Sequence, residues 1–250
     1  MNGEQYIGLC FKHFESKEEI AMERMLLPFA LGGGTILLVG FIILLLLRLE
    51  KKRTNALQVL ATEMGFEFSA IQHEALLARM QIFPLFKKGS FRKMRNVMTT
   101  ETERERLTIF DYRYTTGGGD NSRCYRQTVV AFESDALTLP VFSMRPEGLL
   151  QKLGSSLGMK DIDFEQHSDF SGNFVLTGDD EQSVRQFFDE QLLDLLARHK
   201  GIRVESAPGR FIFFLSRRRK PEQIQEYIKH GYTIYSAFLD RLSRSTSISN

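Results

Sequence analysis

Residues 106–133 read RLTIFDYRYTTGGGDNSRCYRQTVVAFE. β-Branched and aromatic residues dominate both flanks, from 106 to 115 and from 124 to 133, which is the composition of β-strands. The residues between the flanks, Thr115–Ser122, are mostly glycine and small polar residues, which are typical of a flexible hairpin loop. This stretch therefore predicts two antiparallel strands joined by a hairpin.

The segments on either side extend this hairpin into a fold. Residues 93–100 have the same strand composition and Pro140–Met144 is a fourth candidate, so the four segments predict an antiparallel meander. Beyond it, helical patterns alternate with short strands. We expect helices over 146–157, over 178–200 and from Pro221 onward, short strands over 161–164 and 173–177, and a second hairpin formed by 202–205 and 210–215. This order predicts an α+β fold: an antiparallel sheet of meander plus hairpin, with several packed helices.

Residues 25–47, MLLPFALGGGTILLVGFIILLLL, contain no charged side chain. A helix of this length rises about 34 Å, and the hydrocarbon core of a bilayer is roughly 30 Å thick. A cleaved signal peptide fits less well, because a long acidic segment precedes the apolar stretch and no small-residue cleavage site follows it. The sequence therefore predicts one transmembrane helix. Ala30 and Gly34 have the spacing of packed membrane helices, so a homodimer through this helix is one hypothesis.

The charges around the apolar stretch predict its orientation. Basic residues follow it within 48–53, acids prevail before it, and basic flanks stay in the cytosol. The prediction is a single-pass membrane protein with its N-terminus outside and its C-terminal domain in the cytosol. The predicted parts are an extracytoplasmic segment (1–24), the transmembrane helix (25–47), a basic juxtamembrane segment and helix (48–65), an α+β domain (66–242) and a polar tail (243–250).

The overall charge bears on the class of partner. The formal net charge is +2, and from residue 54 onward 26 Lys and Arg residues face 25 Asp and Glu residues. A nucleic-acid-binding domain usually carries a strongly basic balance. We therefore expect no nucleic acid as partner.

One motif points to catalysis. Residues 154–158, GSSLG, match the G-x-S-x-G nucleophile elbow of α/β-hydrolases, with Ser156 as the nucleophile. That elbow needs a strand before the serine and a helix after it, whereas here a predicted helix precedes the serine and a turn follows. Small residues that end a helix explain the same run, so Ser156 is a weak candidate and the sequence favours a protein that is not an enzyme.

A second pattern has the residue types of a metal site. Asp161, Asp163 and Glu165 alternate with Ile162 and Phe164, so on a strand the three acids share one face and can bind a divalent cation. Solvated acids alternating with buried apolar residues explain the pattern without a metal. The acids are weak metal candidates, and we predict no cofactor.

Basic residues form the remaining candidate surface. They follow the apolar stretch and recur in two later runs, the first of which is interleaved with Phe86, Phe91 and Met94. Near anionic lipid each basic charge gains roughly 1 kcal/mol, whereas a solvated loop explains the runs without a ligand. The candidate membrane-surface residues are Arg48, Lys51, Lys52, Arg53, Lys87, Lys88, Arg92, Lys93, Arg217, Arg218 and Arg219.

Several phrases carry a resemblance. They are LATEMGF at 60–66, FDYRYTTG at 110–117 followed by RQTV at 126–129, and MRPE at 144–147 followed by DIDFE at 161–165. Across roughly 57–220 the chain resembles a group of bacterial membrane-anchored proteins of unknown function. The resemblance implies a location at the bacterial inner membrane and brings no catalytic residue with it.

These observations favour a membrane-tethered cytosolic domain that serves interaction, regulation or assembly. The expected partners are the lipid bilayer, anionic lipid headgroups and another membrane protein. Two alternatives stay open: a membrane-anchored hydrolase with an atypical serine site, and a module that binds anionic lipid surfaces.

Overall fold

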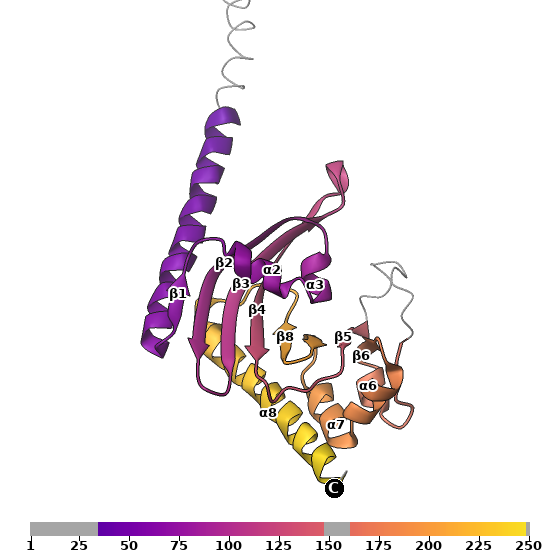
Figure 1. The fold of residues 1–250 in the computed structure, drawn as a ribbon. Helices are drawn as coiled ribbons and strands as arrows, with labels where there is room; N and C mark the ends of the chain where they lie inside the picture. Colours follow the sequence, from indigo (N-terminus) through magenta and orange to yellow (C-terminus); the bar gives the residue numbers. More distant parts are fainter. Residues whose placement is uncertain (1–34, 148–160, 249–250) are drawn as a thin grey trace, which may run out of the picture. The chain divides into compact units, whose positions relative to one another are not determined.

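The computed structural model describes residues 35–147 and 161–248 (Figure 1). The chain divides into two compact units, Met1–Arg53 and Thr54–Asn250. In the first unit the described residues, 35–53, are helical throughout and belong to a helix that covers 35–64. The large apolar side chains from Ile36 to Leu47 on this helix are exposed.

The predicted transmembrane helix needs correction. Among the described residues, none of the helices combines the length and the apolarity that a bilayer crossing requires. The described helix is uncharged only over 35–47, a rise of about 20 Å, before Arg48, Glu50 and Lys51 introduce charge. Residues 25–34 of the predicted span lie outside the described residues. The single-pass topology is therefore wrong, as are the inner-membrane location and the outside N-terminus that were inferred from it.

The second unit is built on one antiparallel sheet, so the predicted α+β class with an antiparallel sheet is confirmed. The strand order is β1-β2-β3-β4-β8-β7-β5-β6, and every pair of neighbours is antiparallel. The strands are β1 (Glu67–Ser69), β2 (Ser90–Glu101), β3 (Arg106–Thr116), β4 (Arg123–Glu133), β5 (Phe142–Pro146), β6 (Phe174–Gly178), β7 (Arg203–Ala207) and β8 (Arg210–Phe214).

The two predicted hairpins form, and the predicted fourth meander strand does not. β2, β3 and β4 are consecutive neighbours, and β7 pairs with β8. The position beside β4 is taken by β8, whose sequence RFIFF is buried on both faces from Phe211 to Phe214. β5 instead pairs with β6 and β7. A strand that is apolar on both faces suits the middle of a sheet, which explains why β8 displaces β5 there.

Helices cover both faces of the sheet (Figure 1). The first face carries Ile109, Val130 and Phe213 and packs against residues 57–61, α6, α7 and α8. The second face carries Tyr112, Val129 and Phe214 and packs against α2 and α3. The helices are α2 (Glu74–Met80), α3 (Pro84–Lys87), α5 (Ser168–Ser171), α6 (Glu181–Phe187), α7 (Glu190–Arg198) and α8 (Ile224–Ile248), with 3₁₀ turns η1 (Gly119–Asn121) and η3 (Pro221–Gln223).

Three predicted elements differ in the structure. The helix expected over 178–200 is two helices, because Asp189 leaves the helical path and its carboxylate caps α7 at the Leu192 amide. The strand expected over 161–164 is irregular, although the Ile162 amide donates to the Leu176 carbonyl. Of the helix expected over 146–157, Pro146 belongs to β5 and residues 148–157 lie outside the described residues.

Gly231 has a packing role in α8. The sequence suggests that a glycine in mid-helix weakens the helix, yet α8 runs through it without a break. A Cβ atom at this position would lie 2.9 Å from Cε2 of Phe132 and 3.2 Å from Cε1 of Phe213. Glycine therefore allows α8 to approach the first face closely, which outweighs its low helix propensity.

Candidate functional site

The predicted catalytic and metal residues do not form a centre within the described residues. Ser156 lies outside them. The Asp161 carboxylate accepts a hydrogen bond from the Leu176 amide at 3.1 Å, so it is engaged with β6. Over residues 35–147 and 161–248, no group of three or more His, Cys, Asp or Glu side chains is arranged to hold a metal ion, Asp163 and Glu165 included.

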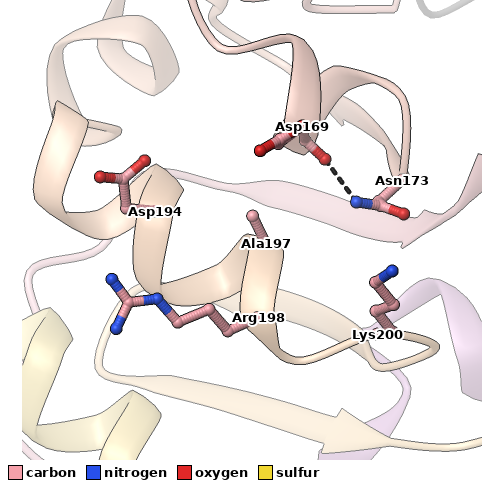
Figure 2. Close-up of a pocket in the computed structure, with 6 residues that line it drawn as sticks. All are labelled: Asp169, Asn173, Asp194, Ala197, Arg198 and Lys200. Atoms are coloured by element: carbon pink, nitrogen blue, oxygen red, sulfur yellow. Dashed lines mark hydrogen bonds between the residues drawn. The ribbon is translucent and has the colours of Figure 1, made fainter.

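A shallow hollow lies between α5 and α7 (Figure 2). Asp169 and Asp194 face Arg198 and Lys200 around Ala197, and the Asn173 side chain donates a hydrogen bond to the Asp169 carbonyl. All four charged residues are exposed, and their charges balance. Exposed and balanced charges give no preference for a charged ligand, so this hollow is a weak candidate site.

The predicted basic residues are distributed over several places. Arg48, Lys51, Lys52 and Arg53 lie on the helix over 35–64, in the first unit. The run from Lys87 to Lys93 surrounds the end of α3 and the start of β2, where its members separate to different faces of the sheet. The Arg92 guanidinium folds back locally and donates to the carbonyls of Lys87 and Gly89. Arg217–Arg219 follow β8.

A row of three cations crosses the meander on its first face. Lys93 on β2 is directly opposite Arg113 on β3, and Arg113 is directly opposite Arg126 on β4. Met94 and Tyr112 belong to the core on the second face, so their sequence neighbours Lys93 and Arg113 point to the first face. All three cations are exposed. Like charges directly opposite each other destabilise a sheet, so this row opposes folding.

The next row holds a buried carboxylate that brings a further cation to this surface. Asp111 is only 7% exposed, and it accepts hydrogen bonds from Asn96 Nδ2 at 2.9 Å and Thr128 Oγ1 at 3.2 Å. Its Oδ2 lies 3.8 Å from Nη1 of Arg218. Asp111 is also directly opposite Arg95, whose side chain is exposed. The carboxylate therefore holds the chain after β8 against the meander.

The Asp111 network is also anchored from the side of β2. Asn96 has a left-handed backbone, with φ of 51°, at a bulge in β2, and its Oδ1 accepts a hydrogen bond from Thr54 Oγ1 at 2.9 Å. The Thr128 hydroxyl accepts a hydrogen bond from the Arg219 amide at 3.0 Å. Polar side chains that are buried and satisfied in this way hold their surroundings rigidly. The neighbouring cations therefore project from a rigid frame.

We name this surface the cationic face; its residues are Lys93, Arg95, Arg113, Arg126 and Arg218. It unites members of both predicted basic runs. Arg113 and Arg126 were missed by the sequence analysis because each is a single basic residue within a strand. The signal that identifies them is the strand register, which pairs them with each other and with Lys93. Guanidinium groups in such an array can hold carboxylates or phosphates through paired hydrogen bonds.

Comparisons with known proteins bear on the fold. No protein-family model and no curated protein sequence matches the chain. Among solved structures, the fold is similar to that of the mycobacterial trehalose monomycolate transport factor A, TtfA. The TM-score is 0.55 at 14% sequence identity, over 76% of this chain and 94% of that chain. At this identity the similarity concerns the fold alone: an antiparallel α+β domain of the kind seen in TtfA.

Proposed function

We propose that this chain is a non-catalytic binding domain whose cationic face docks on an acidic surface of a partner protein. One observation carries the proposal: the register places Lys93, Arg113 and Arg126 side by side and exposed across three strands. Each cross-strand pair of like charges in this row is unfavourable for folding. A local cost to stability is common at surfaces that serve a function.

The composition of the cationic face favours a protein partner. Four of its five residues are arginine, which is enriched at protein–protein interfaces, whereas lysine is depleted there. Arginine also forms paired hydrogen bonds with the carboxylates of Asp and Glu. The chain as a whole has a net charge of only +2, so it lacks the general excess of positive charge that attracts nucleic acid.

A native thiol makes the proposal testable at the surface itself. Cys124 is exposed and lies on β4 two residues before Arg126, so both side chains point to the same face. In a Cys10→Ser variant, a maleimide photocrosslinker attached to Cys124 would report on whatever covers the cationic face. We expect a crosslinked partner of defined mass that is lost in the double variant R113E/R126E and retained in the control R198E/K200E, which alters two exposed cations on another surface.

A defined ligand separates the classes of partner. We expect a fluorescent peptide of alternating Glu and Asp to bind with an affinity that falls steeply with salt, and at least tenfold in R113E/R126E. Vesicles containing phosphatidylglycerol and a duplex DNA oligonucleotide serve as rival ligands. Tighter binding of either rival than of the peptide, with the same loss in R113E/R126E, would replace the acidic protein by that partner. Peptide binding that is equal in the native protein and in R113E/R126E would refute the role of the cationic face.

A further inference from the structure

The second face of the sheet carries a different cationic cluster, close to the end of α3. β5 and β7 pair with Ser143 opposite Glu205 and Met144 opposite Val204. Continuing this register by one residue brings Arg145 opposite Arg203. Lys88, the C-cap residue of α3, is within electrostatic range of Arg145, Arg203 and Glu205. Three half-buried cations therefore gather around one buried carboxylate.

That carboxylate is already engaged. Glu205 is 2% exposed, and its Oε2 accepts a hydrogen bond from the Leu85 amide at 2.8 Å, in the first turn of α3. Within the part of the chain that the structure describes, Lys88, Arg145 and Arg203 form no ion pair. The exposed carboxylate of Asp161 is within electrostatic range of Arg145, but the two residues form no ion pair. Asp161 and Lys87, which acts on Glu205, have opposite charges and cancel, so the three cations and Glu205 leave an excess of two positive charges in a half-buried place.

The surroundings make this excess unfavourable. Burial lowers the pKa of Lys88, and Arg203 and Arg145 lower it further while Glu205 opposes them. Burial likewise lowers the pKa of Arg203, whose guanidinium carbon lies 5.8 Å from the centre of the Phe214 ring. Half-buried charges need either a partner or water, and their removal from water is costly.

Buried polar atoms without a hydrogen-bond partner lie on the same face of the sheet. The Tyr112 hydroxyl and Gln127 Nε2 belong to side chains that are 0% and 3% exposed, and among the described residues neither atom has a partner. Tyr112 and Gln127 are directly opposite each other on β3 and β4. Arg145 Nε is a third such atom. The Tyr112 hydroxyl is within electrostatic range of Glu205, and the Tyr114 hydroxyl of both Glu205 and Arg203.

We propose that Lys88, Arg145 and Arg203 bind a phosphate group on the second face of the sheet. A phosphate monoester carries about 1.5 to 2 negative charges near neutral pH, which matches the excess of two positive charges. The two opposed arginines can each present a pair of N–H donors, and the lysine supplies a point charge. The source of the phosphate group is either inorganic phosphate or a small phosphorylated metabolite.

The site is distinct from the cationic face, since it lies on the other face of the sheet. The Phe86 ring of α3 packs against the Tyr112 ring at an angle of 59°, with 4.6 Å between ring centres. Tyr112, Tyr114 and Tyr125 form a stacked series beyond it, with 5.6 Å and 5.0 Å between successive rings.

Titration calorimetry of the full chain with inorganic phosphate, and separately with glucose 6-phosphate, tests the site. We expect the phosphate affinity to fall about tenfold or more in R145Q and in R203Q. In R203K, which keeps the positive charge but loses the paired N–H donors of the guanidinium group, it should fall about threefold. E205Q removes the one buried negative charge and is expected to tighten binding about threefold. The control R198Q/K200Q should bind as the native protein does. Malonate, a carboxylate dianion, is expected to bind at least tenfold more weakly than phosphate.

The outcomes decide between the alternatives. Tighter binding of glucose 6-phosphate than of inorganic phosphate identifies the metabolite as the source, and equal affinities identify the free ion. ³¹P NMR line broadening in the native protein, absent in R145Q at an unchanged melting temperature, separates loss of the site from loss of the fold. Phosphate affinity that is unaltered in both R145Q and R203Q, or stronger binding of malonate, would overturn the proposal. R113E/R126E should retain phosphate binding, so failure of the cationic face and failure of this site are distinguishable.

Discussion

Reversing the central charge of the cationic row should stabilise the protein while it weakens binding. Arg113 is directly opposite both Lys93 and Arg126. Facing side chains on neighbouring strands lie roughly 5 Å apart, so each like-charge pair costs ~0.8 kcal/mol in water and about half of that at physiological salt. The substitution Arg113→Glu turns two repulsions into two attractions. The expected gain in the free energy of unfolding is about 1.5 kcal/mol, with about half of that for Arg113→Gln.

The assay is urea denaturation at low and at physiological salt, together with thermal melting. A gain of this size corresponds to a rise in melting temperature of about 4 °C for a domain of this length, and the gain should shrink as salt increases. Arg123→Glu is the matched control, because Arg123 is an exposed arginine on the same hairpin whose cross-strand neighbour is Thr116. A loss of stability in R113E, or an equal gain in R123E, would refute the view that repulsion between Lys93, Arg113 and Arg126 destabilises the fold.

Three further predictions follow from the interior. Gly231→Ala should destabilise the protein by about 1 to 3 kcal/mol in urea unfolding, because the new Cβ meets Phe132 at 2.9 Å. This cost should exceed the gain from the better helix propensity of alanine. A gain in stability would contradict the close packing of α8. Asp111→Ala should cost about 3 kcal/mol, because buried donors of Asn96 and Thr128 lose their acceptor; an effect below 0.5 kcal/mol would mean that the network contributes little. Burial raises the pKa of Glu205 to about 6 from an ordinary 4.5, so the folded protein retains a proton that the unfolded chain releases. As the pH rises through roughly 4.5 to 6, the native protein should therefore lose about 2 kcal/mol of unfolding free energy relative to Glu205→Gln. Parallel urea titrations of the two proteins measure this difference. A difference that stays constant over this range would count against the raised pKa.

The correction of the predicted membrane span shows one limit of hydropathy. A run of uncharged residues from 25 to 47 meets the length criterion as a sequence. In the described residues, however, the second half of this run belongs to a helix that continues into the charged residues from Arg48 and ends at residue 64. Leu57 and Ala61, in the last turns of this helix, pack into the core of the second unit. A sequence window does not show where a helix goes after the apolar run ends.

The phosphate cluster shows another limit. Lys88, Arg145 and Arg203 are far apart in the sequence, and the last two lie in short strands where an isolated arginine is unremarkable. Their proximity follows from the β5–β7 pairing and from the position of α3. The sequence pattern around Lys88 predicts a solvated or lipid-facing run, whereas its side chain is half-buried, close to Glu205, Arg203 and Arg145.

The sequence by itself determined the local parts of this protein: the hairpin of β3 and β4 around Thr115–Ser122, the β7–β8 hairpin, and a helix beginning near Pro221. Each depends on residues close together in the chain, whose composition and turn chemistry act without distant partners. Only the tertiary structure decided that β8 lies beside β4, that β5 joins β7, and which cations meet on each face. Those contacts join segments that are remote in sequence. Their stabilising energy comes from burying both faces of the sheet at once, and this burial cannot be predicted from the composition of any single segment.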